Sequence, residues 1–188
     1  CRALMLATGW ALFSCTDKPE NVNRHQVSHQ ERIFYDFSEN IRQRLDTGKN
    51  NPDYHDVAVE YANIGKYFEA IKIYDEGYEN ELPPAAGFSA SHLLGVPAED
   101  FIASEAGKSQ IVLINEAHHV SLHRFFTMRL LKKLYDQGYR YFGAETLSLL
   151  DSTLNSRKYP QLHTGYYSSE PQYGNLIREA LQLGFHVF

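Results

Sequence analysis

Residues 111–114 read Ile-Val-Leu-Ile, and this continuous aliphatic run constrains the fold of the chain more than any other segment. Such a run is typical of a strand buried on both faces, as in a parallel sheet covered by helices. Apolar residues at helical spacing follow over residues 121–137, Gly138 supplies a stop signal, and a second apolar run occupies residues 139–144. Because parallel strands need a long crossover, usually a helix, this order predicts a βαβ unit. The helix is expected to cover the sheet with Leu122, Phe125, Phe126, Leu130, Leu131 and Leu134.

The rest of the C-terminal half continues this alternation. A helix is predicted over about residues 172–183, and residues 184–188 have the character of a third strand. We therefore expect an α/β domain over residues 85–188 with an incomplete parallel βαβ sheet. We also expect the chain to be a fragment, because an unfinished sheet leaves an unpaired edge. Residues 149–171 are polar and longer than a plain crossover needs, which favours a functional lid.

Residues 30–84 are predicted to be α-helical. Apolar residues recur at helical spacing over residues 30–45, and residues 53–79 are expected to form two antiparallel helices broken at Gly65. A proline-rich breaker at residues 82–87 is the expected boundary with the α/β domain. The helix pair resembles one tetratricopeptide repeat. A single repeat cannot bury its own faces and a peptide groove needs several, so we expect a packed scaffold, with a protein-binding role as the alternative. The residues that carry this resemblance are Ala58, Tyr61, Gly65, Tyr67, Ala70, Tyr74 and Pro83.

The first fifteen residues have the composition of an export leader. Arg2 precedes an apolar run over residues 3–13, which is too short to span a bilayer and fits the hydrophobic region of a signal peptide. The run ends in Leu-Phe-Ser before Cys15, which resembles a lipobox with a lipid-bearing cysteine. We expect a lipoprotein signal at residues 1–15, a tether at residues 16–29, and a protein exported to the bacterial cell envelope and anchored to a membrane. An ordinary secretory signal and a buried helix are the alternatives. Both cysteines lie in this leader, so no disulfide is expected in the body of the protein.

The charge pattern argues against one class of partner. The formal net charge is -5, and Lys and Arg are scattered among Asp and Glu without forming a basic stripe. Nucleic acid is therefore not expected to bind, since its backbone must be neutralised by clustered basic residues. Nucleotide binding also lacks support, because no glycine-rich phosphate loop follows a predicted strand.

Ionisable residues follow the two predicted strands. Glu116, His118 and His119 come directly after the first strand, and Glu145 follows the second. Ligands of an open α/β sheet bind outside the carboxyl ends of its strands, so we expect these side chains to converge in one crevice. A carboxylate beside a histidine suits general acid–base chemistry, because it orients the imidazole and stabilises its charged form. The alternative is structural: each glutamate could cap a helix, and the histidines could be turn residues.

The segment Asn-Glu-Ala-His-His at residues 115–119, followed by the predicted helix and strand, resembles the start of the erythromycin esterase and ChaN-like superfamily. The esterase motif falls on Glu116, His119 and Glu145. The resemblance implies a hydrolase that acts on an ester or lactone. His119 would activate water as a general base, the glutamates would orient it, and no metal or cofactor would be needed.

The ChaN-like pattern falls on different histidines. It carries a Glu-x-His motif and a further histidine in the next helix, which match Glu116, His118 and His123. This resemblance implies a surface lipoprotein that binds haem or iron. The sequence satisfies both patterns because two histidines stand in a row, so hydrolase, haem binder and helical scaffold remain open. Asn115 stands where both families have glycine, and Val120 stands where the esterases have the glycine that follows their histidine.

Overall fold

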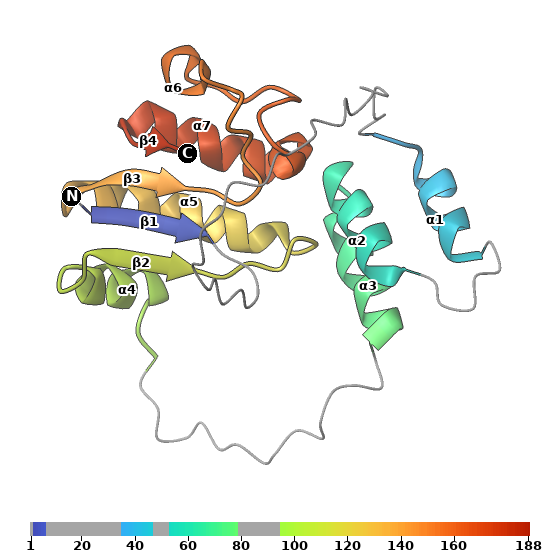
Figure 1. Ribbon diagram of the computed structural model, residues 1–188. Helices are drawn as coiled ribbons and strands as arrows, with labels where there is room; N and C mark the ends of the chain where they lie inside the picture. Colours follow the sequence, from blue (N-terminus) through green and yellow to red (C-terminus); the bar gives the residue numbers. More distant parts are fainter. Residues whose placement is uncertain (1, 7–34, 47–52, 79–94) are drawn as a thin grey trace, which may run out of the picture.

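The computed structural model describes residues 2–6, 35–46, 53–78 and 95–188 (Figure 1). These residues form a mixed α/β fold, in which three helices follow the first strand and precede the other strands of the sheet and their helices. None of the helices in the described ranges is long and apolar enough to cross a membrane.

The sheet has four strands in the order β2-β1-β3-β4, and each neighbouring pair is parallel. Helix α5 (Ser121–Asp136) connects β2 (Ile111–Ile114) to β3 (Tyr139–Gly143). Helix α7 (Pro171–Leu183) then connects β3 to β4 (His186–Val187). The predicted alternation of strands and helices over this part of the chain is confirmed. Glycine follows both connecting helices in the left-handed conformation, at Gly138 and Gly184, which accounts for where the helices end.

Strand β1 (Arg2–Leu6) was not predicted, and it lies in the middle of the sheet (Figure 1). Leu4 is in register with Val112 of β2 on one side and with Phe142 of β3 on the other. The two strands of the βαβ unit predicted over residues 111–144 would be neighbours in a simple unit, and this is wrong because β1 lies between β2 and β3. These residues belong to the segment that was interpreted as an export leader. That interpretation missed the strand because a short apolar run fits a signal peptide as well as a strand. The remainder of that segment, including Cys15, and the expected tether lie outside the described residues.

The helices cover one face of the sheet. Val112, Ile114, Phe142 and Val187 pack in the same core as the buried faces of α5 and α7. The intervening residues of β2 point away from this core, and Ile111 remains 56% and Leu113 63% exposed. The prediction that this strand is buried on both faces is wrong for the described residues, because the second face has no helix layer among them.

Helix α5 covers the sheet with only part of its predicted apolar face. Leu130, Leu131 and Leu134 are fully buried, as expected. Leu122 and Phe125, in the first turns, remain 68% and 46% exposed. The buried face of these turns carries Ser121, Arg124 and Thr127 instead, so Leu122 and Phe125 lie on the opposite face of the helix.

The N-terminal helices form a second core. Helices α1 (Ser38–Asp46), α2 (Tyr54–Asn63) and α3 (Tyr67–Tyr78) follow one another, and α2 and α3 form the predicted pair with the turn at Gly65, whose φ is +76°. The two helices are in close contact and are called the helical hairpin below. Small residues at their contact allow this approach, and the resemblance to a tetratricopeptide repeat stays a prediction. The core consists of Ile41, Val57, Ala58, Tyr61, Ala62, Ala70 and Ile73.

The expected boundary at residues 82–87 lies outside the described residues. The chain is described again from residue 95, and helix α4 (Ala98–Ala106) begins after Pro97. Proline suits this position because a helix start needs no backbone donor there, and Glu99 and Asp100 complement the helix dipole.

Candidate functional site

A histidine and a carboxylate form the centre of the candidate site. The turn after β2 carries His118, and the segment after β3 carries Glu145. Nε2 of His118 lies 2.9 Å from Oε2 of Glu145, and the two side chains are 10% and 29% exposed. The structure therefore brings Glu145 to His118, whereas the esterase resemblance pairs it with His119.

A tyrosine from the long loop completes this arrangement. The hydroxyl of Tyr167, in the short 3-10 helix η1 (Tyr166–Ser169), lies 2.7 Å from Nδ1 of His118. A carboxylate only accepts hydrogen bonds, so Nε2 donates to Glu145, Nδ1 accepts, and the Tyr167 hydroxyl donates. Burial raises the pKa of Tyr167 to about 12, with the charge of Glu145 as a further cause. At neutral pH this hydroxyl therefore keeps its proton.

His119 occupies a different environment. Its ring stacks on Tyr74 of α3, with centroids 3.8 Å apart and planes 11° from parallel. His119 is 7% exposed, and its Nδ1 atom is buried without a hydrogen-bond partner among the described residues. Burial, followed by the nearby imidazole of His55, lowers the pKa of His119 to about 4. The structure thus shows His119 as a neutral packing residue at neutral pH.

Glu116 belongs to a buried ion-pair network behind the His118 turn. Nε of Arg124 lies 3.1 Å from Oε1 of Glu116, and an Nη1 atom of the same guanidinium lies 2.8 Å from Oε2 of Glu170. All three side chains are at most 1% exposed. The predicted convergence of Glu116 with the histidines is therefore replaced by an arginine between two carboxylates.

Glu170 joins this network to helix α7. Its carboxylate accepts hydrogen bonds from the backbone N–H groups of Gln172 and Tyr173 at the helix start, and from the hydroxyl of Ser121. The hydroxyl of Tyr173 in turn donates to the backbone carbonyl of Glu145. These contacts fix the segment that presents Glu145 to His118. The sequence signal for Glu170 was an acidic residue directly before a proline, a pattern typical of a helix start.

His123 also supports the turn. Its Nδ1 accepts a hydrogen bond of 3.0 Å from the backbone N–H of Ala117. The residue thus fixes the conformation of the segment that carries His118. Haem ligation, the role implied by the ChaN-like pattern, requires a free imidazole nitrogen, and both nitrogens of His118 and Nδ1 of His123 have partners. The haem interpretation stays a prediction.

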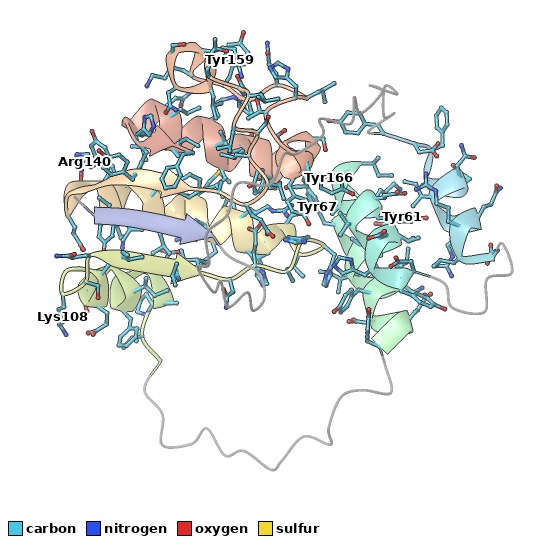
Figure 2. The ribbon with its side chains drawn as sticks, viewed as in Figure 1. Tyr61, Tyr67, Lys108, Arg140, Tyr159 and Tyr166 are labelled. Atoms are coloured by element: carbon cyan, nitrogen blue, oxygen red, sulfur yellow. The ribbon has the colours of Figure 1, made fainter. Side chains whose placement is uncertain are left out.

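The helical hairpin borders the site. Figure 2 shows Tyr67 at the junction of the hairpin and the α/β part, and its side chain hydrogen-bonds those of Gln172 and Glu170. The ring of His55 in α2 lies 6.3 Å from that of His118. The expectation that the hairpin packs on its neighbours is confirmed, and its tyrosines and His55 are residues of the site that the sequence did not single out.

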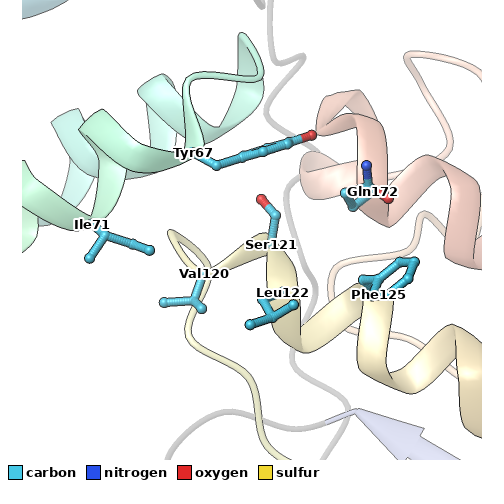
Figure 3. A pocket seen from close by; sticks show the side chains of 7 residues that line it. All are labelled: Tyr67, Ile71, Val120, Ser121, Leu122, Phe125 and Gln172. Carbon is cyan, nitrogen blue, oxygen red and sulfur yellow. The ribbon is translucent and has the colours of Figure 1, made fainter.

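An apolar pocket of about 220 Å³ lies beside the site (Figure 3). Helix α3 and the start of α5 form its walls, and Tyr67 and Ser121 are the lining residues that carry hydroxyls. Two of its lining residues, Val120 and Ser121, follow shortly after His118 in the sequence, so the turn that carries this histidine leads into the pocket wall. Its lining consists of Tyr67, Ile71, Val120, Ser121, Leu122, Phe125 and Gln172.

One group among the described residues has the separation of metal ligands: Asp53, His55 and Asp56 have ligand atoms within 4.8 Å of one another. This group stands at the start of α2, where Asp53 accepts a hydrogen bond from the backbone N–H of Asp56. Helix capping explains the two carboxylates. The group therefore carries no assignment.

Comparison of the chain with protein-family models, with curated proteins and with solved structures finds no match. The resemblance to the erythromycin esterase and ChaN-like superfamily rests on the motif residues alone. The function proposed below is argued from the geometry of the site.

Proposed function

We propose that this protein is a hydrolase that cleaves an ester or lactone by general-base catalysis at His118. The observation that carries the proposal is the 2.9 Å pair between Nε2 of His118 and Oε2 of Glu145. A carboxylate bound to one nitrogen of an imidazole fixes the tautomer in which the other nitrogen accepts a proton. Nδ1 of His118 is then the basic atom of the site.

The reaction follows from this assignment. Water placed at Nδ1 of His118 gives up a proton as its oxygen forms a bond to the ester carbonyl carbon. The carbonyl electron pair moves to the carbonyl oxygen, and Glu145 stabilises the imidazolium formed on His118. Collapse of the tetrahedral intermediate breaks the bond to the alcohol, and the departing oxygen takes the proton from Nδ1.

The base in this proposal is His118 rather than His119. His119 lies flat against Tyr74 with no carboxylate bound to its ring among the described residues, and its pKa of about 4 makes it a weak base. Glu116 is neutralised by Arg124 and supports the turn from behind. His118, which directly precedes His119 in the chain, thus takes the role of base that the esterase resemblance gives to His119.

The apolar pocket supports a substrate with an apolar group. Its walls come from Ile71, Leu122 and Phe125, which are otherwise exposed hydrophobic side chains, so an apolar ligand would remove them from water. We propose that the acyl part of a small ester occupies this pocket while its carbonyl reaches His118. Export and lipid anchoring at Cys15 stay predictions, because Cys15 lies outside the described residues.

Hydrolysis of p-nitrophenyl butyrate tests the proposal. His118→Gln and Glu145→Gln should each lower kcat at least about 100-fold, the size of a typical general-base contribution. His163→Ala provides the control, because this loop histidine has a 65% exposed side chain. His119→Phe, which keeps a flat ring against Tyr74, should retain most of the activity. An inactive wild-type protein, or activity lost in His119→Phe but kept in His118→Gln, contradicts the proposal.

A further inference from the structure

The hydroxyl of Tyr167 occupies the one atom of His118 on which the proposed reaction depends. Its 2.7 Å hydrogen bond to Nδ1, together with the 2.9 Å pair between Nε2 and Glu145, makes a continuous chain of carboxylate, imidazole and hydroxyl. The order of groups matches a nucleophile–base–orienter arrangement. In the reaction proposed above the attacking group is water, so the Tyr167 hydroxyl takes the other role that this geometry allows, that of a hydrogen-bond donor.

The backbone around Tyr167 is fixed against the end of β3. Leu147 and Gly165 form an antiparallel bridge, and the backbone N–H of Tyr167 donates to the hydroxyl of Thr146 over 3.4 Å. A Cβ atom on Gly165 would lie 2.6 Å from the carbonyl oxygen of Thr146, so only glycine permits this close approach. The loop therefore places Tyr167 in a fixed position beside the segment that carries Glu145.

The Tyr167 ring is held by its neighbours as well. It contacts the ring of His118 with centroids 4.0 Å apart, and Tyr166 and Tyr173 meet it edge-on. The guanidinium of Arg124 lies 5.6 Å from its centroid, which links it to the buried ion-pair network. A donor fixed in this way needs little reorganisation during a reaction.

We infer that Tyr167 is a further catalytic residue of this site, and that its hydroxyl donates a hydrogen bond to the oxyanion of the tetrahedral intermediate. This inference rests on the proposed function. When an ester carbonyl and a water enter, the carbonyl oxygen replaces Nδ1 as the acceptor of the Tyr167 hydroxyl, and Nδ1 becomes free to take the proton of the water. The negative charge that develops on the carbonyl oxygen strengthens this hydrogen bond, which favours the transition state over the ground state. Tyr167 keeps its own proton throughout.

Tyr167→Phe tests this role, with Tyr166→Phe as the matched control from the same 3-10 helix. Both changes remove one hydroxyl and keep the ring. Tyr167→Phe should lower kcat for p-nitrophenyl butyrate about 100-fold, as expected for one oxyanion donor, and should change KM less than threefold. Tyr166→Phe should leave both constants within twofold of the wild-type values.

The outcomes separate the inference from the proposed function. If His118→Gln abolishes hydrolysis but Tyr167→Phe leaves kcat unchanged, Tyr167 is not catalytic and the general-base proposal stands. A rise of kcat in Tyr167→Phe also overturns the inference, because the hydroxyl would then only block Nδ1. A wild-type protein without esterase activity overturns both. Circular dichroism spectra and melting temperatures within 3 °C of wild type, about the change that 1 kcal/mol produces, verify that each variant is folded.

Discussion

His119 and Tyr74 bring the α/β part and the helical hairpin into contact, with ring centroids 3.8 Å apart and planes 11° from parallel. The stack explains why His119 is only 7% exposed. Its neighbour in the chain, His118, points in a different direction, toward the carboxylate of Glu145. The hairpin is therefore part of the wall of the candidate site. Acidification should weaken this contact, because protonation places a charge in a buried position beside other imidazoles.

The pKa of His119 leads to a prediction for stability. This pKa is about 4 in the folded protein, whereas an unperturbed histidine in an unfolded chain has a pKa of 6.5, so the unfolded state binds more protons between these values. The stabilisation from neutral His119 is fully present above pH 6.5 and is lost as the pH falls toward 4. The loss of unfolding free energy from this one residue is at most about 3 kcal/mol. Urea unfolding at pH 7, 5.5 and 4.5 measures it. His119→Phe should lose less stability over this range, and an equal loss in both proteins would contradict the assignment.

Arg124 should be the most sensitive single position of the buried network. Arg124→Met leaves Glu116 and Glu170 buried without their counter-charge, which should cost about 3–5 kcal/mol of unfolding free energy. Arg124→Lys should recover only part of this loss, because one ammonium cannot span two carboxylates as a guanidinium does. Adding Glu116→Gln to Arg124→Met should restore at least about 1 kcal/mol, since one buried charge is removed. Urea unfolding checks all three, and a loss below about 1 kcal/mol in Arg124→Met would show that the network is not strongly coupled.

The proposed acyl pocket makes a prediction about substrate length. Phe125→Ala removes an aromatic wall, so it should raise the ratio of kcat/KM for p-nitrophenyl octanoate to that for the butyrate by about tenfold. Phe68→Ala is the control, because Phe68 is 78% exposed and does not line the pocket. A ratio that stays constant in Phe125→Ala, or moves equally in both variants, would show that the acyl group binds elsewhere.

The parts of the fold that depend on local pattern were predictable from the sequence. The aliphatic run of β2, the spacing of apolar residues in α5 and the glycines that end α5 and α7 each act within one segment. The neighbours of a strand are set by contacts far along the chain, and no local signal placed Arg2–Leu6 between β2 and β3. An apolar run of this length has the same composition in a leader and in a buried strand.

The candidate site shows the same division. Its ionisable residues were found because they follow strand ends, and Glu145 does contact a motif histidine. The identity of that histidine depended on the turn, which Ala117 and His123 fix and which directs adjacent side chains to opposite environments. The partners Tyr167, Arg124 and Tyr74 come from a loop and from two helices, and only the tertiary structure brings them to the turn. Tyr167 lies within residues 149–171, which were predicted to form a functional lid, and its hydrogen bond to His118 identifies it as a residue of the site.

Strand β1 leads to the last prediction. If Arg2–Leu6 pairs with both neighbours, as the register of Leu4 with Val112 and Phe142 requires, then Leu4→Pro removes a backbone donor in the middle of the sheet. The variant should lose about 3 kcal/mol or more of unfolding free energy, whereas Leu4→Ile, which keeps the donor and suits a strand, should lose less than about 1 kcal/mol. Mass spectrometry of the N-terminus of the cellular protein is the second measurement. A protein cleaved before Cys15 that unfolds with the same free energy as the full chain would show that this segment is a leader and not a strand of the sheet.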